Sequence, residues 1–187
     1  MCVRGIDSQK SRATILATMK EIVFLNPEYV SEEEMRSYRV REAARAVVFD
    51  ADDNVALLHA IKNDYYKLPG GGLDDDTDKI VALKRECREE LGCDVEVLGE
   101  IGIVNEWRKF CALHQISYCY VAKVVGDKGE PDFTEDEIAE GFEVVWFPYE
   151  KARNMLSESK AVEIEAREYM VPRDVAILEA SKIRTTS

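Results

Sequence analysis

The chain has 187 residues, enough for one domain with a sizeable core and too few for two. Its hydrophobic fraction of 46% and charged fraction of 33% are typical of a soluble globular protein. The net charge of −12 argues against RNA or DNA as a general partner, although a bound cation would still let a small phosphorylated molecule approach. Five cysteines without paired spacing indicate reduced thiols, and no apolar run is long enough to span a bilayer. We therefore expect a cytoplasmic protein with no membrane partner.

The first half of the chain carries patterns typical of a helix, a hairpin and a glycine-rich loop. Apolar residues at helical spacing predict the helix, and a turn-forming sequence over 51–54 separates the two strands of the hairpin. Three glycines after Pro69 favour an irregular backbone. The predicted elements are a helix over 8–24, a Glu-rich connector over 26–36, strands over 45–50 and 55–59, and an irregular loop over 67–72.

The second half begins with the clearest helix pattern of the chain, which ends at Gly92. The predicted elements are a helix over 77–91, strands over 95–107 and 116–125 joined by a loop over 109–114, an acidic loop over 126–138, a strand over 143–147, a helix over 148–156, and a helical stretch over 161–183 interrupted at Pro172. Strands that alternate with a few helices predict an α+β fold, with one mixed sheet flanked by helices. We expect an N-terminal helical extension over 1–38 and one domain over 39–187.

Three glutamates of the helix over 77–91 share one face. Glu86, Glu89 and Glu90 stand at positions i, i+3 and i+4, within an arc of about 100°. Carboxylates crowded in this way repel one another unless a cation lies between them, and Mg²⁺ prefers such oxygen ligands. The alternative is a solvated acidic face. Glu90 lies beside Leu83 on the apolar stripe, whereas a solvated face should lie opposite that stripe, so the pattern favours a metal site.

The segment from Gly71 to Cys93 resembles the Nudix box, which reads Gly, five residues, Glu, seven residues, then Arg-Glu-hydrophobic-x-Glu-Glu-x-Gly-hydrophobic. The positions that match are Gly71, Arg85, Glu86, Cys87, Glu89, Glu90, Gly92 and Cys93. The preceding Tyr66-Lys67-Leu68-Pro69-Gly70-Gly71 is similar to the aromatic-x-Leu-Pro-Gly-Gly that leads into the box. The resemblance implies the family's αβα sandwich over about 39–156, and hydrolysis of a phosphoanhydride bond in a nucleoside-diphosphate-type molecule.

One position departs from the box, because Thr77 stands where the family has its first Glu. In the family that Glu helps to hold the box together, often by pairing with the Arg, which is Arg85 here. Thr77 is able to cap a helix but carries no charge, and Asp76 or Asp78 is available to replace the missing carboxylate. Since the three metal-binding glutamates are intact, we expect activity to be retained.

The resemblance also implies roles for individual residues. The implied metal ligands are Glu86, Glu89, Glu90 and the carbonyl of Gly70, and the implied catalytic residues are Glu89, Glu86, Arg85 and Glu137. The cofactor would be Mg²⁺, with Mn²⁺ as a substitute. Glu137 is chosen because many members add a carboxylate from a loop before a late strand. Glu140 is the second candidate for that role, and a solvated acidic loop is an equal alternative.

Candidates for substrate binding lie around the expected cleft. Gly71 and Gly72 lack Cβ atoms and would let the backbone approach a phosphate closely. Arg45 opens a strand near this cleft, with a rim salt bridge as the alternative. Tyr66 and Trp107 are placed to stack on a base, although aromatic residues at strand ends more often belong to the core.

Subfamily marks outside the box mostly exclude substrates. The Pro typical of ADP-ribose hydrolases is missing from 107–111, and the coenzyme A signature is absent. What remains is a nucleoside triphosphate pyrophosphohydrolase, with a dinucleotide or a nucleotide sugar as the runner-up substrate. The alternative class is a non-catalytic Nudix module that binds a nucleotide, but such modules usually lack a box glutamate. Dimers are common in the family, so the resemblance allows a homodimer, and the sequence does not determine the oligomeric state.

Overall fold

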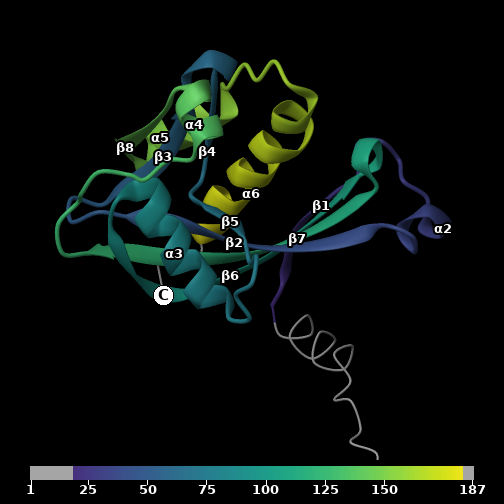
Figure 1. Ribbon diagram of the computed structural model, residues 1–187, viewed down its shortest axis with the longest axis horizontal. Coiled ribbons are helices and arrows are strands. Elements are labelled where there is room, and N and C mark those ends of the chain that lie inside the picture. The colour runs from purple at the N-terminus through teal and green to yellow at the C-terminus, as the bar shows by residue number, and fades with distance from the viewer. Residues whose placement is uncertain (1–18, 183–187) are drawn as a thin grey trace, which may run out of the picture.

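The computed structural model describes residues 19–182, and one mixed β-sheet forms their centre (Figure 1). The strands are β1 (Glu21–Leu25), β2 (Arg39–Phe49), β3 (Asn54–Ala60), β4 (Tyr65–Lys67), β5 (Gly70–Gly72), β6 (Asp94–Arg108), β7 (Leu113–Val125) and β8 (Phe142–Pro148). Their order is β1-β6-β7-β2-β3-β4, with β5 paired to β2 and β8 paired to β3. β2 runs parallel to β7 and β1 runs parallel to β6, whereas the other pairs are antiparallel.

Helices cover both faces of this sheet (Figure 1), which confirms the predicted fold class. The helices are α2 (Glu32–Met35), α3 (Lys79–Leu91), α4 (Glu135–Glu140), α5 (Tyr149–Ser157) and α6 (Val171–Ser181), with 3₁₀ turns η1 (Ile61–Asn63) and η2 (Lys109–Cys111) and a π-helical segment η3 (Ala166–Met170). α3 packs on one face over a core that includes Leu83 and Tyr118. α5 and α6 pack on the other face through Leu156 and Ile177. Within residues 19–182, no helix is long and apolar enough to cross a membrane.

Alternation along β2 serves both cores. Ala44, Ala46 and Val48 lie in the core beneath α3, whereas Val47 lies in the core beneath α5 and α6. Because successive side chains of a strand point to opposite faces, Arg45 shares the α6 face with Val47. The strand thus carries an arginine, Arg45, that is only 5% exposed and lies on the face covered by the C-terminal helix.

The three consecutive glycines, Gly70–Gly72, form a strand of the sheet. β2 pairs with β3 beside the turn, at Phe49–Val55, and farther along it pairs with β5. Gly70 has a φ of +127°, and a Cβ atom at this position would lie 2.2 Å from the carbonyl oxygen of Ala44. Only glycine fits there, and its lack of a side chain lets β5 lie close against β2. The irregular backbone predicted over 67–72 is therefore wrong for Gly70–Gly72.

The N-terminal prediction also needs correction. The helix predicted over 8–24 is wrong for residues 21–24, because Glu21–Leu25 form β1 beside β6, while residues 8–18 lie outside the described residues. Since β1 belongs to the central sheet, the segment predicted as a helical extension over 1–38 contributes a strand to the fold.

The remaining predicted elements are present with shifted boundaries. The acidic loop predicted over 126–138 contains the start of α4. Pro172 does not interrupt the helical stretch, because the π-helical segment η3 runs directly into α6, in which Pro172 is the second residue.

Candidate active site

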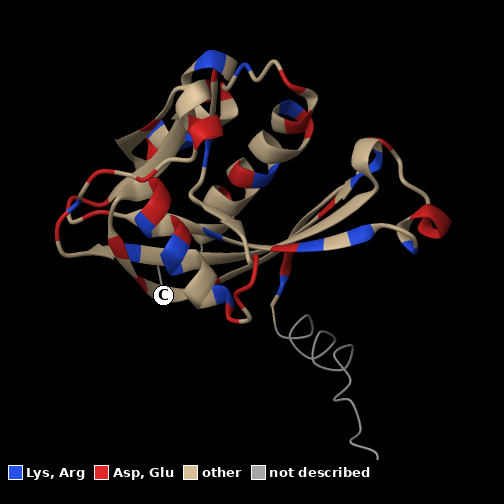
Figure 2. Ribbon diagram, in the orientation of Figure 1, with Lys and Arg blue, Asp and Glu red and all other residues tan. Residues whose placement is uncertain are grey.

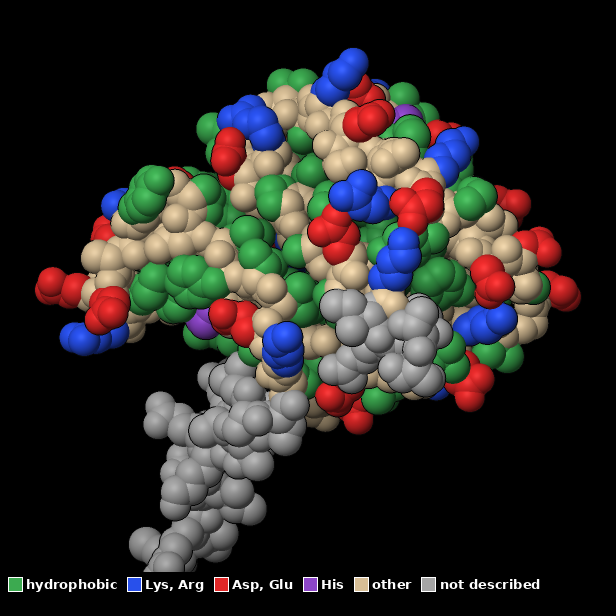
Figure 3. Space-filling model, turned by 180° about the vertical axis from the view of Figure 1, so that it is seen from behind, with side chains coloured by type: hydrophobic (Ala, Val, Ile, Leu, Met, Phe, Trp, Pro, Cys, Tyr) green, Lys and Arg blue, Asp and Glu red, His purple; other side chains and the backbone are tan. Residues whose placement is uncertain are grey.

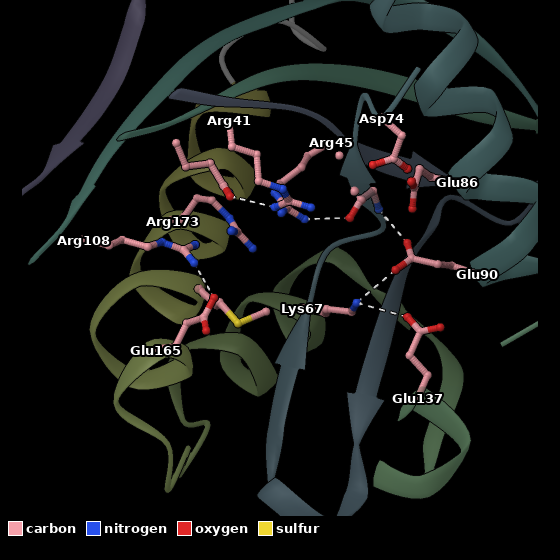
Figure 4. Close-up of a pocket in the computed structure, with 15 residues that line it drawn as sticks. Arg41, Arg45, Lys67, Asp74, Glu86, Glu90, Arg108, Glu137, Glu165 and Arg173 are labelled. Atoms are coloured by element: carbon pink, nitrogen blue, oxygen red, sulfur yellow. Dashed lines mark hydrogen bonds and ion pairs between the residues drawn. The ribbon is translucent and has the colours of Figure 1, made fainter. Parts of the chain in front are cut away.

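A cavity of about 280 Å³ lies beside the glycine strand β5 and is almost entirely polar (Figure 4). Its only apolar side chain among the described residues is that of Met170. The acidic residues that line it are Asp74, Glu86, Glu90, Glu137 and Glu165, and the basic ones are Arg41, Arg45, Lys67, Arg108 and Arg173. They come from strands β2, β4 and β6, from helices α3, α4 and α6, and from the segments that precede α3 and α6. The cavity therefore gathers charge of both signs from distant parts of the chain.

The three glutamates of α3 differ in exposure. The side chain of Glu90 is 6% exposed, that of Glu86 is 12% exposed, and that of Glu89 is 46% exposed. Burial, with the negative charge of Glu90 added, raises the pKa of Glu86 to about 7, although Arg85 opposes the shift. A carboxylate whose charged form is disfavoured in this way is stabilised by a cation.

The donor chemistry of this face fits Mg²⁺, which takes hard carboxylate oxygens. Within residues 19–182, however, no three potential ligand side chains converge as a ready-made metal site. Arg85 and Lys67 contact the glutamates instead. The Gly70 carbonyl, the fourth predicted ligand, accepts a hydrogen bond of 2.7 Å from Nη1 of Arg45. The predicted ligands thus lie beside one another, and basic side chains occupy several of their oxygens.

Arg85 ties the glycine strand to two of the glutamates. Its guanidinium donates to the carbonyl of Gly72 at 3.1 Å, to Glu86 at 2.8 Å and to Glu89 at 3.1 Å. The close approach of Glu86 also depends on Gly71, because a Cβ atom there would lie 2.4 Å from the Glu86 carboxylate. Arg85 therefore positions the glutamate face of α3 against the backbone of β5.

Asp76 supplies the carboxylate that Thr77 lacks. Its Oδ2 atom accepts from Nε of Arg85 at 3.1 Å. Asp78 has a different role, since its side chain accepts from the backbone N–H groups of Ile80 and Val81 and caps α3. The helix therefore begins at Lys79, two residues later than predicted. Figure 2 shows the acidic segment that precedes α3.

We expect Thr77→Glu to leave turnover within about twofold of wild type, because Arg85 already has a carboxylate partner at the same end of the helix. Asp76→Asn should lower turnover by about fivefold, and Thr77→Glu should restore most of it in the Asp76→Asn background. Steady-state kinetics of the two single variants and the double variant test this. A double variant no better than Asp76→Asn would contradict the exchange of roles between positions 76 and 77.

Lys67 lines the cavity, although no pattern in the sequence predicted it as a site residue. Its Nζ atom lies 2.9 Å from Oε1 of Glu90, 3.7 Å from Oε1 of Glu137 and 4.7 Å from the ring centroid of Phe142. The whole residue is 9% exposed. Figure 4 shows this ammonium group between the two carboxylates. A positive charge of the chain itself therefore lies between a predicted metal ligand and the predicted catalytic carboxylate.

Glu137 lines the cavity from α4, whereas Glu140, the second candidate, is not among its lining residues. Oε2 of Glu137 accepts from the backbone N–H and the hydroxyl of Thr134, which completes a capping box. The other carboxylate oxygen faces Lys67. Glu137 thus has a structural role at the start of α4 and a position at the edge of the site.

Two predicted substrate-binding residues lie elsewhere. Tyr66 stacks on His59 with ring centroids 4.2 Å apart, and Trp107 stacks on His114 at 3.8 Å. Neither ring lines the cavity, whereas Arg45, Gly71 and Gly72 do. A base that entered this cavity would therefore not meet the two aromatic rings that the sequence suggested.

Other lining residues, among them Arg41, Gln115 and Arg173, were not predicted from the sequence. Arg41 is four positions from Arg45 on β2, and the two-residue period of a strand places both side chains on one face, so a signal was available. Gln115 and Arg173 come from two further elements, and no local pattern joins them. Arg108, which follows Trp107, was a weaker candidate, and it lines the cavity from β6.

The model of the family described as the NUDIX domain matches residues 39–170. Solved structures with similar folds include a NUDIX hydrolase from Nitrosomonas europaea, with a TM-score of 0.57 at 16% identity, over 79% of this chain and 90% of that chain. The MutT protein from Methanosarcina mazei Go1 has a TM-score of 0.55 at 16% identity, over 81% of this chain and 99% of that chain. A UDP-X diphosphatase has a TM-score of 0.54 at 13% identity, over 96% of this chain and 73% of that chain. Identities this low show a shared fold. No curated protein matches the chain.

Proposed function

Because the chain belongs to the Nudix family, we propose that it hydrolyses a phosphoanhydride bond in a nucleoside-diphosphate-linked small molecule, with Mg²⁺ as cofactor. One observation carries the proposal: the three box glutamates are all present on α3, and two of them line a polar cavity beside the glycine strand. The preferred substrate is a nucleoside triphosphate, cleaved as by a pyrophosphohydrolase. Mn²⁺ is the substitute metal.

The residues of the site would have separate roles in this reaction. Glu86, Glu89 and Glu90 would hold the metal, which when bound neutralises phosphate charge and activates water. Arg85 positions two of these glutamates and the backbone of β5. Glu137 would help to orient the water, since it lines the same cavity on the far side of Lys67 from Glu90.

The runner-up substrates are a dinucleotide and a nucleotide sugar, and the rival class is a nucleotide-binding module without turnover. A screen of nucleoside triphosphates, dinucleotides and nucleotide sugars with Mg²⁺ or Mn²⁺ separates them. Turnover of a triphosphate above the others supports the proposal. Nucleotide binding without turnover of any member would favour the binding module.

The charge distribution supports a small-molecule substrate over nucleic acid. The face seen from behind mixes acidic, basic and hydrophobic side chains (Figure 3), and the net charge is −12. A nucleic-acid footprint would need a basic stripe. We infer a cytoplasmic enzyme that acts on free nucleotides, with a homodimer as the assembly to test by light scattering.

Water should be the nucleophile, and a nucleoside triphosphate should give the monophosphate and pyrophosphate as products. The two thiols of the box, Cys87 and Cys93, are buried, and burial raises the pKa of each, so neither is suited to act as a nucleophile. A single turnover in ¹⁸O-labelled water should place label in one product without a covalent intermediate. Orthophosphate and a diphosphate as primary products, or a trapped phosphoenzyme, would show that this chemistry is wrong.

A further inference from the structure

Three arginines that line the cavity are buried and incompletely paired. Arg45 is 5% exposed, Arg108 is 4% exposed and Arg173 is fully buried. Among the described residues, no acceptor is found for Nε of Arg45, Nε of Arg108 or Nη1 of Arg173. Buried N–H groups without a partner are costly, and an anion in the cavity is a natural acceptor for them.

The arginines differ in the charge of their neighbours. Arg108 is paired with the carboxylates of Glu106 and Glu165. Arg41 and Arg45 instead donate to neutral oxygens, Oε1 of Gln115 at 2.8 Å and the carbonyl of Gly70 at 2.7 Å. In residues 19–182 neither of these two arginines forms an ion pair within 4.0 Å, so each keeps a positive charge available to a ligand.

Arg173 lies beside them on α6, and two carboxylates balance its charge. Asp174 and Glu106, both fully buried, hold its guanidinium, and Asp174 also accepts from the backbone N–H of Leu68 at 2.9 Å. These contacts fix α6 to the segment that leads into the glycine strand. Burial, with the positive charge of Arg173 added, lowers the pKa of Arg45 to about 10, which still leaves the guanidinium charged near neutral pH.

We propose that Arg41 and Arg45 form a subsite for a phosphoryl group beyond the two that share the cleaved bond, with Arg173 as the buried residue that fixes α6 beside them. The inference rests on the proposed function and narrows its substrate class to nucleoside triphosphates, whose γ-phosphoryl group enters the subsite. Guanidinium groups bind phosphate oxygens through charged, two-pronged hydrogen bonds. A nucleotide sugar would place an uncharged ring there and leave the arginines unpaired.

Two features separate this subsite from the box. Arg173 and Asp174 lie beyond residue 170, where the match to the NUDIX domain model ends, so the matched segment does not contain the buried ion pair that fixes α6 beside the arginines. Within residues 19–182, no aromatic side chain lines the cavity. The base and ribose therefore lie outside it, and the phosphate chain enters.

Arg41→Gln is the cleanest test variant. Arg41 is half-buried and its partner is a neutral amide, so the change removes charge without leaving a buried carboxylate unpaired. Arg153→Gln is the matched control, because Arg153 is an exposed arginine on α5 that pairs with Glu179. Thermal unfolding should show that both variants remain folded.

Calorimetry in EDTA, with inorganic tripolyphosphate as the titrant, tests the subsite without turnover. We expect saturable binding by wild type, binding weaker by about tenfold or more in Arg41→Gln, and a change within about twofold in Arg153→Gln. No saturable binding by wild type, or equal binding by wild type and Arg41→Gln, overturns the subsite.

Steady-state kinetics with Mg²⁺ are the second test of the subsite. In Arg41→Gln the ratio of kcat/KM for a nucleoside triphosphate to that for a nucleotide sugar should fall by about tenfold. An unchanged ratio overturns the assignment to the extra phosphoryl group. Failure of wild type to hydrolyse any phosphoanhydride would overturn the proposed function and leave the calorimetric result standing.

Discussion

Glu89→Gln should lower turnover by about a thousandfold and leave the fold intact. The Glu89 carboxylate is 46% exposed and contacts Arg85, so an isosteric loss of charge costs little stability. Its expected role is to hold the metal, and metal-bound charge contributes several kcal/mol to stabilisation of the transition state. At about 1.4 kcal/mol per factor of ten, the loss amounts to roughly three orders of magnitude in kcat.

Two further variants show whether the loss of turnover is specific to Glu89. Glu96→Gln changes an exposed glutamate on β6, away from the cavity, and should keep wild-type turnover. Glu90→Gln should lower both turnover and stability, because the buried Glu90 carboxylate accepts from the backbone N–H of Gly70 and from Lys67. Wild-type turnover of Glu89→Gln on the best substrate of the screen would show that this carboxylate does not hold the metal.

The parts of the fold that follow local patterns were accessible from the sequence. α3 was predicted because its apolar stripe repeats at helical spacing and Gly92 ends it in a left-handed conformation, as the structure has it. The hairpin of β2 and β3 was predicted from a turn sequence between two apolar runs. In each case the signal lies within the element itself.

The failures have a common cause in contacts between distant segments. Ile22 fits a helical stripe with Met19, but Ile22, Val23 and Phe24 are also an apolar run that suits a strand, and pairing with β6 decides between the two. Gly70–Gly72 carry no side-chain pattern, and it is β2 that orders them. Partners of this kind are not visible in the segment that they order.

The candidate site divides in the same way. Arg85 and its glutamates lie within one helix turn or two, so their spacing alone brought them together. Arg173 reaches the cavity through a buried ionic network, with a hydrogen bond from Leu68 to Asp174 that spans more than a hundred residues. No spacing rule connects positions so far apart, and only the fold shows that Arg173 reaches the cavity.

Lys67→Met should destabilise the chain in EDTA and make its stability depend more strongly on Mg²⁺. Lys67 contacts Glu90 at 2.9 Å, and the two residues are 9% and 4% exposed. Removing one partner of a buried ion pair leaves an uncompensated charge, at a cost of about 3 kcal/mol. For a chain of this size that corresponds to a fall in Tm of roughly 6–12 °C.

Mg²⁺ should recover most of this loss, because a divalent cation near Glu90 and Glu137 would replace the missing ammonium charge. Thermal unfolding of wild type and Lys67→Met is measured in EDTA and in Mg²⁺. The Tm deficit of the variant in EDTA is then compared with its Tm deficit in Mg²⁺. Lys151→Met is the matched control, since Lys151 also lies over a ring, that of Phe147 at 4.0 Å, but outside the cavity. It should lose little stability in either condition. An equal deficit of Lys67→Met with and without Mg²⁺ would mean that the lysine supports the fold without occupying a cation position. Recovery confined to Lys67→Met would instead mean that the lysine and the divalent cation compete for the same carboxylates.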